Sequence, residues 1–111
     1  MKASPEYVVD ASVVVKWFSG SGQDVENSER LLNSHIEGTS TLVSSSLVLY
    51  EVCNALRLNP NFSQQDLSRA ATSLLKLGLE LVDYSEIFES AIALALSEEI
   101  TIYDAAYIVV S

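Results

Sequence analysis

Three carboxylates differ from the other acidic residues because each is the only charged residue within an apolar stretch of the sequence. Asp10 lies in YVVDASVVV, Glu51 in LVLYEVCNAL and Asp104 in ITIYDAAYIVV. A carboxylate in a buried segment is costly unless a basic group, backbone N–H groups, protonation or a metal ion compensates it. Basic partners are scarce, since only Lys16 and Arg57 lie close in sequence to any of the three. If the three converge, their mutual repulsion therefore requires a cation.

The residue types favour a hard divalent cation. Carboxylates and water suit Mg²⁺ or Mn²⁺, and an acid-lined site for such an ion indicates phosphodiester chemistry. Zinc is not indicated, because the single histidine and the single cysteine lie far apart in sequence. We expect His35 on a helix surface and Cys53 in the core. A non-catalytic interpretation stays open, with Asp10 and Asp104 as helix caps and Glu51 as a partly exposed helix residue.

Composition limits the classes of protein that the chain can belong to. Its 111 residues are enough for one domain with a real core. No apolar run is long enough to span a bilayer, and the start lacks the features of a secretory signal. A single cysteine fits a reducing cytoplasm. The net charge of −9 excludes a broad basic face for nucleic acid. Nucleic-acid binding would then need a bound cation, a partner or a local basic patch.

Periodicity predicts strands separated by helices. Strands are expected over 7–12, 41–46 and 79–83, and a linker over 19–24. Helices are expected over 13–18, 24–37 and 47–58, the first of them capped by Ser12. A further helix begins at a capping box of Ser63 and Asp66 and ends at Gly78, another is capped by Ser85, and the last lies near Asp104. Such alternation indicates an α/β fold with a central parallel sheet. In that fold ligands bind beyond the carboxyl ends of the strands, where Asp10 would lie.

The segments YVVDASVVVKWF, LYEVCNAL and ITIYDAAY resemble the PIN-domain family, most closely the VapC-type toxins of toxin–antitoxin pairs. The resemblance covers nearly the whole chain, so residues 1–111 are expected to be one PIN-like domain with a three-layer α/β/α architecture. It implies a metal-dependent endoribonuclease in which Asp10, Glu51 and Asp104 bind Mg²⁺ or Mn²⁺ and carry catalysis. It also implies a cognate antitoxin partner and a homodimer.

The resemblance assigns supporting roles to further polar residues. Ser12 matches a hydroxyl position beside the pocket, and Asn54 matches a polar position on the helical face of Glu51. Lys16 fits the family pattern as a phosphate contact or as a surface residue. Tyr107, one turn after Asp104, is expected to pack rather than take part in chemistry.

The chain departs from the family pattern at its end. Family members continue into another strand that carries a fourth acid, whereas this sequence stops at Ser111. We therefore expect the domain to be incomplete at the C-terminus, which would leave the first strand as an open apolar edge.

Two other classes of function compete with the nuclease. A degenerate or truncated PIN-like domain could serve as a protein-interaction module, and the absent fourth acid favours that interpretation. Phosphotransfer receivers and haloacid-dehalogenase-like phosphatases also place an aspartate after the first strand. The phosphatase pattern requires a second Asp where this chain has Ser12, and a receiver requires a late lysine, whereas no lysine follows Lys76. Both are disfavoured.

Overall fold

The computed structural model describes residues 5–20 and 24–110, and it confirms the alternation of strands and helices. The elements in chain order are β1 (Glu6–Val8), α1 (Ala11–Ser19), α2 (Val25–Glu37), β2 (Thr41–Ser45), α3 (Val48–Leu56), α4 (Gln64–Leu77), β3 (Glu80–Val82), α5 (Tyr84–Glu98) and α6 (Ile102–Val110). Residues 21–23 of the predicted linker lie outside the described residues. None of the helices in the described ranges is long and apolar enough to cross a membrane.

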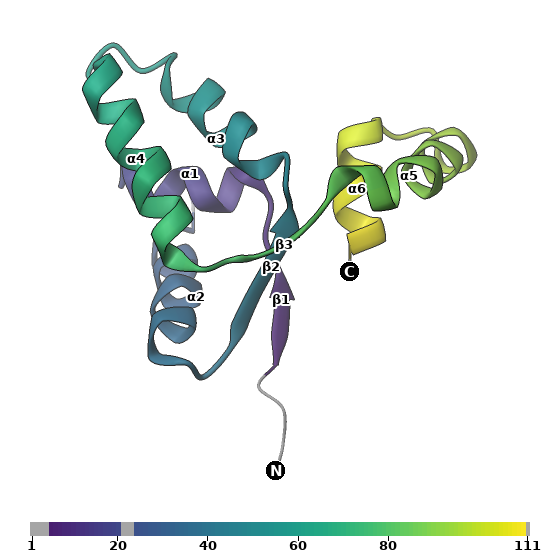
Figure 1. Ribbon diagram of the computed structural model, residues 1–111, viewed down its shortest axis with the longest axis horizontal. Helices are drawn as coiled ribbons and strands as arrows, with labels where there is room; N and C mark the ends of the chain where they lie inside the picture. The colour runs from purple at the N-terminus through teal and green to yellow at the C-terminus, as the bar shows by residue number, and fades with distance from the viewer. Residues whose placement is uncertain (1–4, 21–23, 111) are drawn as a thin grey trace.

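The strands form a parallel sheet in the order β1-β2-β3, as predicted. Tyr7 of β1 is in register with Leu42 of β2, and Ser44 of β2 is in register with Leu81 of β3. Helices α1 to α4 lie on one side of the sheet and α5 and α6 on the other, which gives a three-layer α/β/α architecture (Figure 1). The central strand β2 is almost wholly buried, whereas β1 and β3 are largely exposed.

Local capping signals fix where the helices begin, and two of them differ from the prediction. The capping box of Ser63 and Asp66 is present at the start of α4. The cap of α1, however, is Asp10 rather than Ser12, and the cap of α5 is Asp83 rather than Ser85. In both cases the aspartate carboxylate accepts a backbone N–H of the first turn, so the helix begins earlier than the serine would place it.

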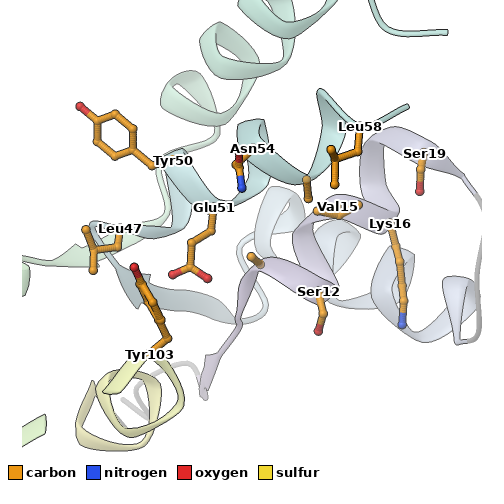
Figure 2. A pocket seen from close by; sticks show the side chains of 12 residues that line it. Ser12, Val15, Lys16, Ser19, Leu47, Tyr50, Glu51, Asn54, Leu58 and Tyr103 are labelled. Carbon is orange, nitrogen blue, oxygen red and sulfur yellow. The ribbon is translucent and has the colours of Figure 1, made fainter. Parts of the chain in front are cut away.

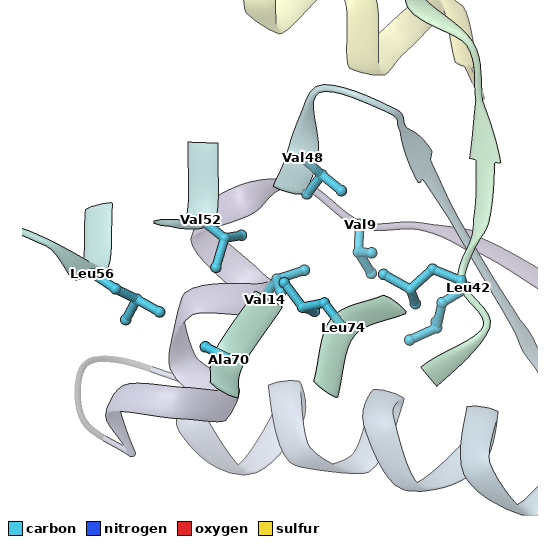
Figure 3. Packing of buried hydrophobic residues seen from close by; sticks show 9 residues of the cluster. Val9, Val14, Leu42, Val48, Val52, Leu56, Ala70 and Leu74 are labelled. Atoms are coloured by element: carbon cyan, nitrogen blue, oxygen red, sulfur yellow. The ribbon is translucent and has the colours of Figure 1, made fainter. Parts of the chain in front are cut away.

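Two separate apolar clusters hold the layers together. The larger lies between the sheet and α1, α3 and α4 and is built mostly from valine and leucine (Figure 3). Its buried members are Val9, Val14, Leu42, Val48, Val52, Leu56, Ala70, Leu74 and Leu79. The smaller lies between α5 and α6, and its buried members are Ile87, Ala91, Ala95, Ala105 and Ala106. Because a buried Leu or Val contributes about 1.5–3 kcal/mol and a methyl far less, the first cluster supplies most of the hydrophobic stabilisation.

His35 is not the surface residue that the sequence suggested. Its Nδ1 accepts the backbone N–H of Leu42 at 3.1 Å, and its Nε2 lies 2.9 Å from the carbonyl oxygen of Leu77. An Nδ1 that accepts leaves Nε2 to carry the hydrogen and donate it. The ring thus connects α2, β2 and the end of α4, which is a structural role.

Candidate active site

The three isolated carboxylates come from three different elements. Asp10 follows β1 and caps α1, with its Oδ1 3.2 Å from the backbone nitrogen of Val13. Glu51 lies in the first turn of α3, the helix that follows β2. Asp104 lies in the first turn of α6, on the opposite side of the sheet from α1 and α3 (Figure 1). The carboxyl end of the sheet is therefore the place where they approach one another.

The electrostatic environment of Glu51 includes the other two acids. The pKa of Glu51 is raised, first by burial and then by the negative charges of Asp10 and Asp104. A hydrogen bond from Tyr107 opposes this rise by favouring the charged form. The two other acids thus add to the effect of burial in disfavouring the charged form of Glu51.

Tyr107 contributes more to this site than the packing role predicted for it. Its hydroxyl donates to Oε1 of Glu51 at 3.0 Å, and the hydroxyl oxygen also interacts with the backbone of Ala11. Burial and the neighbouring Glu51 together hold the pKa of Tyr107 well above its usual range. The phenol therefore remains a donor and joins α6 to α3 and to the start of α1. Its position one turn after Asp104, on the same helical face, is the sequence signal that could have identified it.

The donor chemistry of the three acids fits a hard divalent cation, because all the available ligand atoms are carboxylate oxygens. Yet among residues 5–20 and 24–110 no group of three Asp, Glu, His or Cys side chains is gathered closely enough to hold an ion. For all three to bind one ion, the side chains must draw together.

A groove between α1 and α3 has Glu51 in its lining and brings several predicted residues together (Figure 2). Its volume is about 1060 Å³, and Ser12, Lys16 and Asn54 line it together with Glu51. The remaining lining residues are Ala11, Val15, Ser19, Leu47, Tyr50, Ala55, Leu58 and Tyr103. Asp10 and Asp104 are not among the lining residues. The groove thus gathers all three supporting residues but only one of the three acids.

Two of these polar residues are held by neighbours. The hydroxyl of Ser12 donates to Oδ1 of Asp10 at 2.5 Å. The side-chain oxygen of Asn54 accepts a hydrogen bond from Nε–H of Arg57 at 2.8 Å. The Ser12 hydroxyl therefore helps to hold the Asp10 carboxylate in place, and the Asn54 side chain holds the guanidinium of Arg57.

The chain is an α/β/α domain with acidic residues from three elements near the carboxyl end of its parallel sheet. Residues 7–111 match the family described as PIN domain, and the chain belongs to that family. PIN domains are typically nucleases that depend on divalent metals. No curated protein matched the chain.

Proposed function

We propose that this PIN domain is a metal-dependent endoribonuclease and the toxin component of a toxin–antitoxin pair. The observation that supports the proposal is that, besides burial, Asp10 and Asp104 from two other elements raise the pKa of Glu51. A partly buried carboxylate whose pKa is raised by burial and by neighbouring acids is a candidate functional group. The family match supports the nuclease class.

In this proposal Asp10, Glu51 and Asp104 hold a Mg²⁺ or Mn²⁺ ion. When bound, the ion would activate water and neutralise charge on the phosphodiester. The chain's own residues prepare the acids for this role. Ser12 orients Asp10, and Tyr107 orients Glu51 by occupying Oε1, which leaves Oε2 for the ion. Lys16 is a candidate phosphate contact in the adjoining groove.

The toxin role, a cognate antitoxin, a homodimer and action in the cytoplasm rest on the resemblance of the three acid-bearing segments to VapC-type toxins. Neutralisation by an antitoxin would be visible as loss of RNA cleavage when the cognate antitoxin is added. Size-exclusion chromatography with light scattering would test the homodimer.

The decisive experiment is cleavage of a mixed RNA substrate with Mn²⁺ or Mg²⁺, on protein of verified intact mass, with EDTA as a control. Asp10→Asn is the informative variant, because asparagine caps helices as well as aspartate does and α1 should remain intact. Asp83→Asn makes the same change at the cap of α5 and is the matched control. We expect cleavage to be lost in Asp10→Asn and retained in Asp83→Asn.

The second candidate is a catalytically degenerate PIN domain that binds a protein partner. The separation of the three acids in the described residues favours it, since no ready ion site is formed. If RNA is not cleaved with any of the metal ions tested, while circular dichroism shows an intact fold, this interpretation is favoured over the nuclease.

A further inference from the structure

His35 is the only histidine of the chain, and both nitrogens of its partly buried ring contact backbone groups of other elements. Nδ1 accepts the N–H of Leu42, and Nε2 lies within hydrogen-bond distance of the carbonyl oxygen of Leu77. A backbone N–H can only donate, and a backbone carbonyl can only accept. The two contacts therefore require one state of the ring, the neutral form with its hydrogen on Nε2.

The bond to Leu42 lies where the sheet has no partner strand. Successive residues of a strand direct their N–H groups to opposite edges, so Thr41 donates to Pro5 on the β1 side and Leu42 faces the β3 side. Strand β3 begins only at Glu80, which is in register with Val43, one residue beyond Leu42. The imidazole ring thus takes the place of a strand residue at the amino end of the sheet.

The contact with Leu77 serves the end of α4. Leu77 is the last residue of that helix, where carbonyl groups have no N–H partner within the helix. The Nε2–H group supplies a partner from the last turn of α2, where His35 lies. One ring therefore joins three elements, namely the ends of α2 and α4 and the first part of β2.

A proton on Nδ1 would replace an acceptor with a donor. The ring N–H and the N–H of Leu42 would then face each other, and neither could form a hydrogen bond there. The nearest ionisable residues along the adjoining elements are Glu37 on α2, Lys76 on α4 and Glu80 on β3, and all three are exposed. Strand β2 has none, and both hydrogen bonds described for the ring are to backbone groups.

We propose that His35 is a pH-dependent link, which holds the ends of α2 and α4 to β2 when the ring is neutral and releases Leu42 when it is protonated. Histidine commonly changes its charge between about pH 5 and pH 8. The open state then binds the additional proton, so the link is intact at neutral pH and is lost as the pH falls. It lies at the amino end of the sheet, away from the candidate acids, and does not depend on the proposed function.

Hydrogen exchange of the Leu42 amide, corrected for the intrinsic pH dependence of exchange, measures the link directly. We expect its protection to fall about tenfold from about pH 7.5 to about pH 5.5, because one hydrogen bond is lost. The Thr41 amide is the internal control, since it donates to the carbonyl of Pro5, which does not titrate. Equal loss at both amides would mean that the whole sheet opens, and the inference would be wrong.

His35→Gln removes the titrating group and keeps a side chain with one acceptor and one donor group. Protection of the Leu42 amide in this variant should not change over the same pH range. All the carboxylates are identical in the two proteins, so they cannot cause a difference between them. If the variant loses protection as the wild type does, another group is responsible and His35 is not the link.

Nitrogen NMR of the wild-type ring tests the inference without a substitution. At neutral pH the hydrogen should lie on Nε2, and Nδ1 should carry none. Protonation of Nδ1 and loss of protection at Leu42 should then follow the same pH curve. A hydrogen on Nδ1 at neutral pH, or two curves with separate midpoints, would overturn the proposal.

Discussion

The two apolar clusters define two regions of different construction. The main body, made of β1 to β3 and α1 to α4, has a core of interlocking valine and leucine side chains. The helical pair, α5 and α6, is packed mostly through alanine methyl groups. Helix α6 rests on β2, and Tyr107 forms a hydrogen bond to Glu51 across the junction. The comparison teaches that two cores built from side chains of different size meet at one hydrogen bond, between Tyr107 and Glu51.

This division bears on how the site could assemble. The main body provides Asp10 and Glu51, whereas the helical pair provides Asp104 and Tyr107. A buried alanine contributes less burial than a buried leucine or valine, although its small size lets α5 and α6 pack closely. If a cation binds between Glu51 and Asp104, we expect it to add a contact across the junction of the two regions.

The largest effect should come from Leu42→Ala, which removes a fully buried side chain from the central strand of the main body. We expect the free energy of unfolding to fall by about 2–5 kcal/mol, through lost burial and the cavity left behind. Ala95→Gly in the helical pair should cost about 1 kcal/mol, mainly from helix propensity. Urea denaturation measures both. A larger loss for Ala95→Gly than for Leu42→Ala would reverse the comparison.

Leu75→Ala is the matched control for the first of these changes. Leu75 lies on α4 with 66% of its surface exposed, so its truncation creates no cavity. Its effect should stay within about 0.5 kcal/mol. A loss as large as that for Leu42→Ala would show that leucine content, rather than burial, determines the result.

Tyr107→Phe tests the junction between the two regions, and its effect on the free energy of unfolding should be intermediate. The change keeps the ring and removes only the hydroxyl that donates to Glu51. A hydrogen bond to a charged acceptor contributes about 1.5 kcal/mol, and we expect the free energy of unfolding to fall by that amount. The pKa of Glu51 should also rise further, since the Tyr107 bond is what lowers it. Denaturation and carboxylate NMR titration measure the two effects.

Tyr103→Phe is the control on the same helix, because its hydroxyl has no hydrogen bond among the described residues. It should change neither the stability nor the pKa of Glu51. If Tyr107→Phe also left the pKa of Glu51 unchanged, the bond would not orient that carboxylate in solution.

The sequence predicted the features of the fold that depend on local signals. The capping box of Ser63 and Asp66 is encoded within four consecutive residues, and the parallel sheet follows from strands that alternate with helices. The caps at Asp10 and Asp83 were misplaced by two residues because a nearby serine is an equally good cap by type. Only the backbone conformation decides between the two.

The sequence predicts Asp10, Glu51 and Asp104 as site residues because a lone charge in an apolar segment is visible in the sequence itself, and that assignment stays a prediction. The contacts made by other residues near them could not be predicted in the same way. The bond of Tyr107 to Glu51 and the contacts of His35 with Leu42 and Leu77 depend on tertiary packing, which no local pattern encodes. Their sequence context fits a packing tyrosine and a surface histidine equally well, so both were misinterpreted.

The smallest effect should be a pH-dependent gain in stability from Glu51→Gln. Burial and two neighbouring acids raise the folded-state pKa of Glu51 above its ordinary value of 4.5, so the fold favours the protonated form. The folded state then binds more protons than the unfolded state, and wild-type stability falls as pH rises from 4.5 through the folded pKa. Glutamine carries no charge and retains an oxygen for the Tyr107 hydroxyl. We expect the variant to be more stable at neutral pH by no more than about 1 kcal/mol, because solvent screens the site.

Urea denaturation at several pH values measures this gain, which should vanish below the ordinary pKa of a glutamate. Glu29→Gln, exposed on α2, removes one negative charge from the same net total and should show no such pH dependence. Addition of Mn²⁺ should stabilise the wild type more than Glu51→Gln, since a cation relieves the repulsion that the substitution has already removed. If Glu51→Gln were less stable than the wild type at neutral pH, the surroundings of Glu51 would stabilise its charged form. The main body would then gain stability from the carboxylate, and the junction with the helical pair would have no repulsion for a cation to relieve.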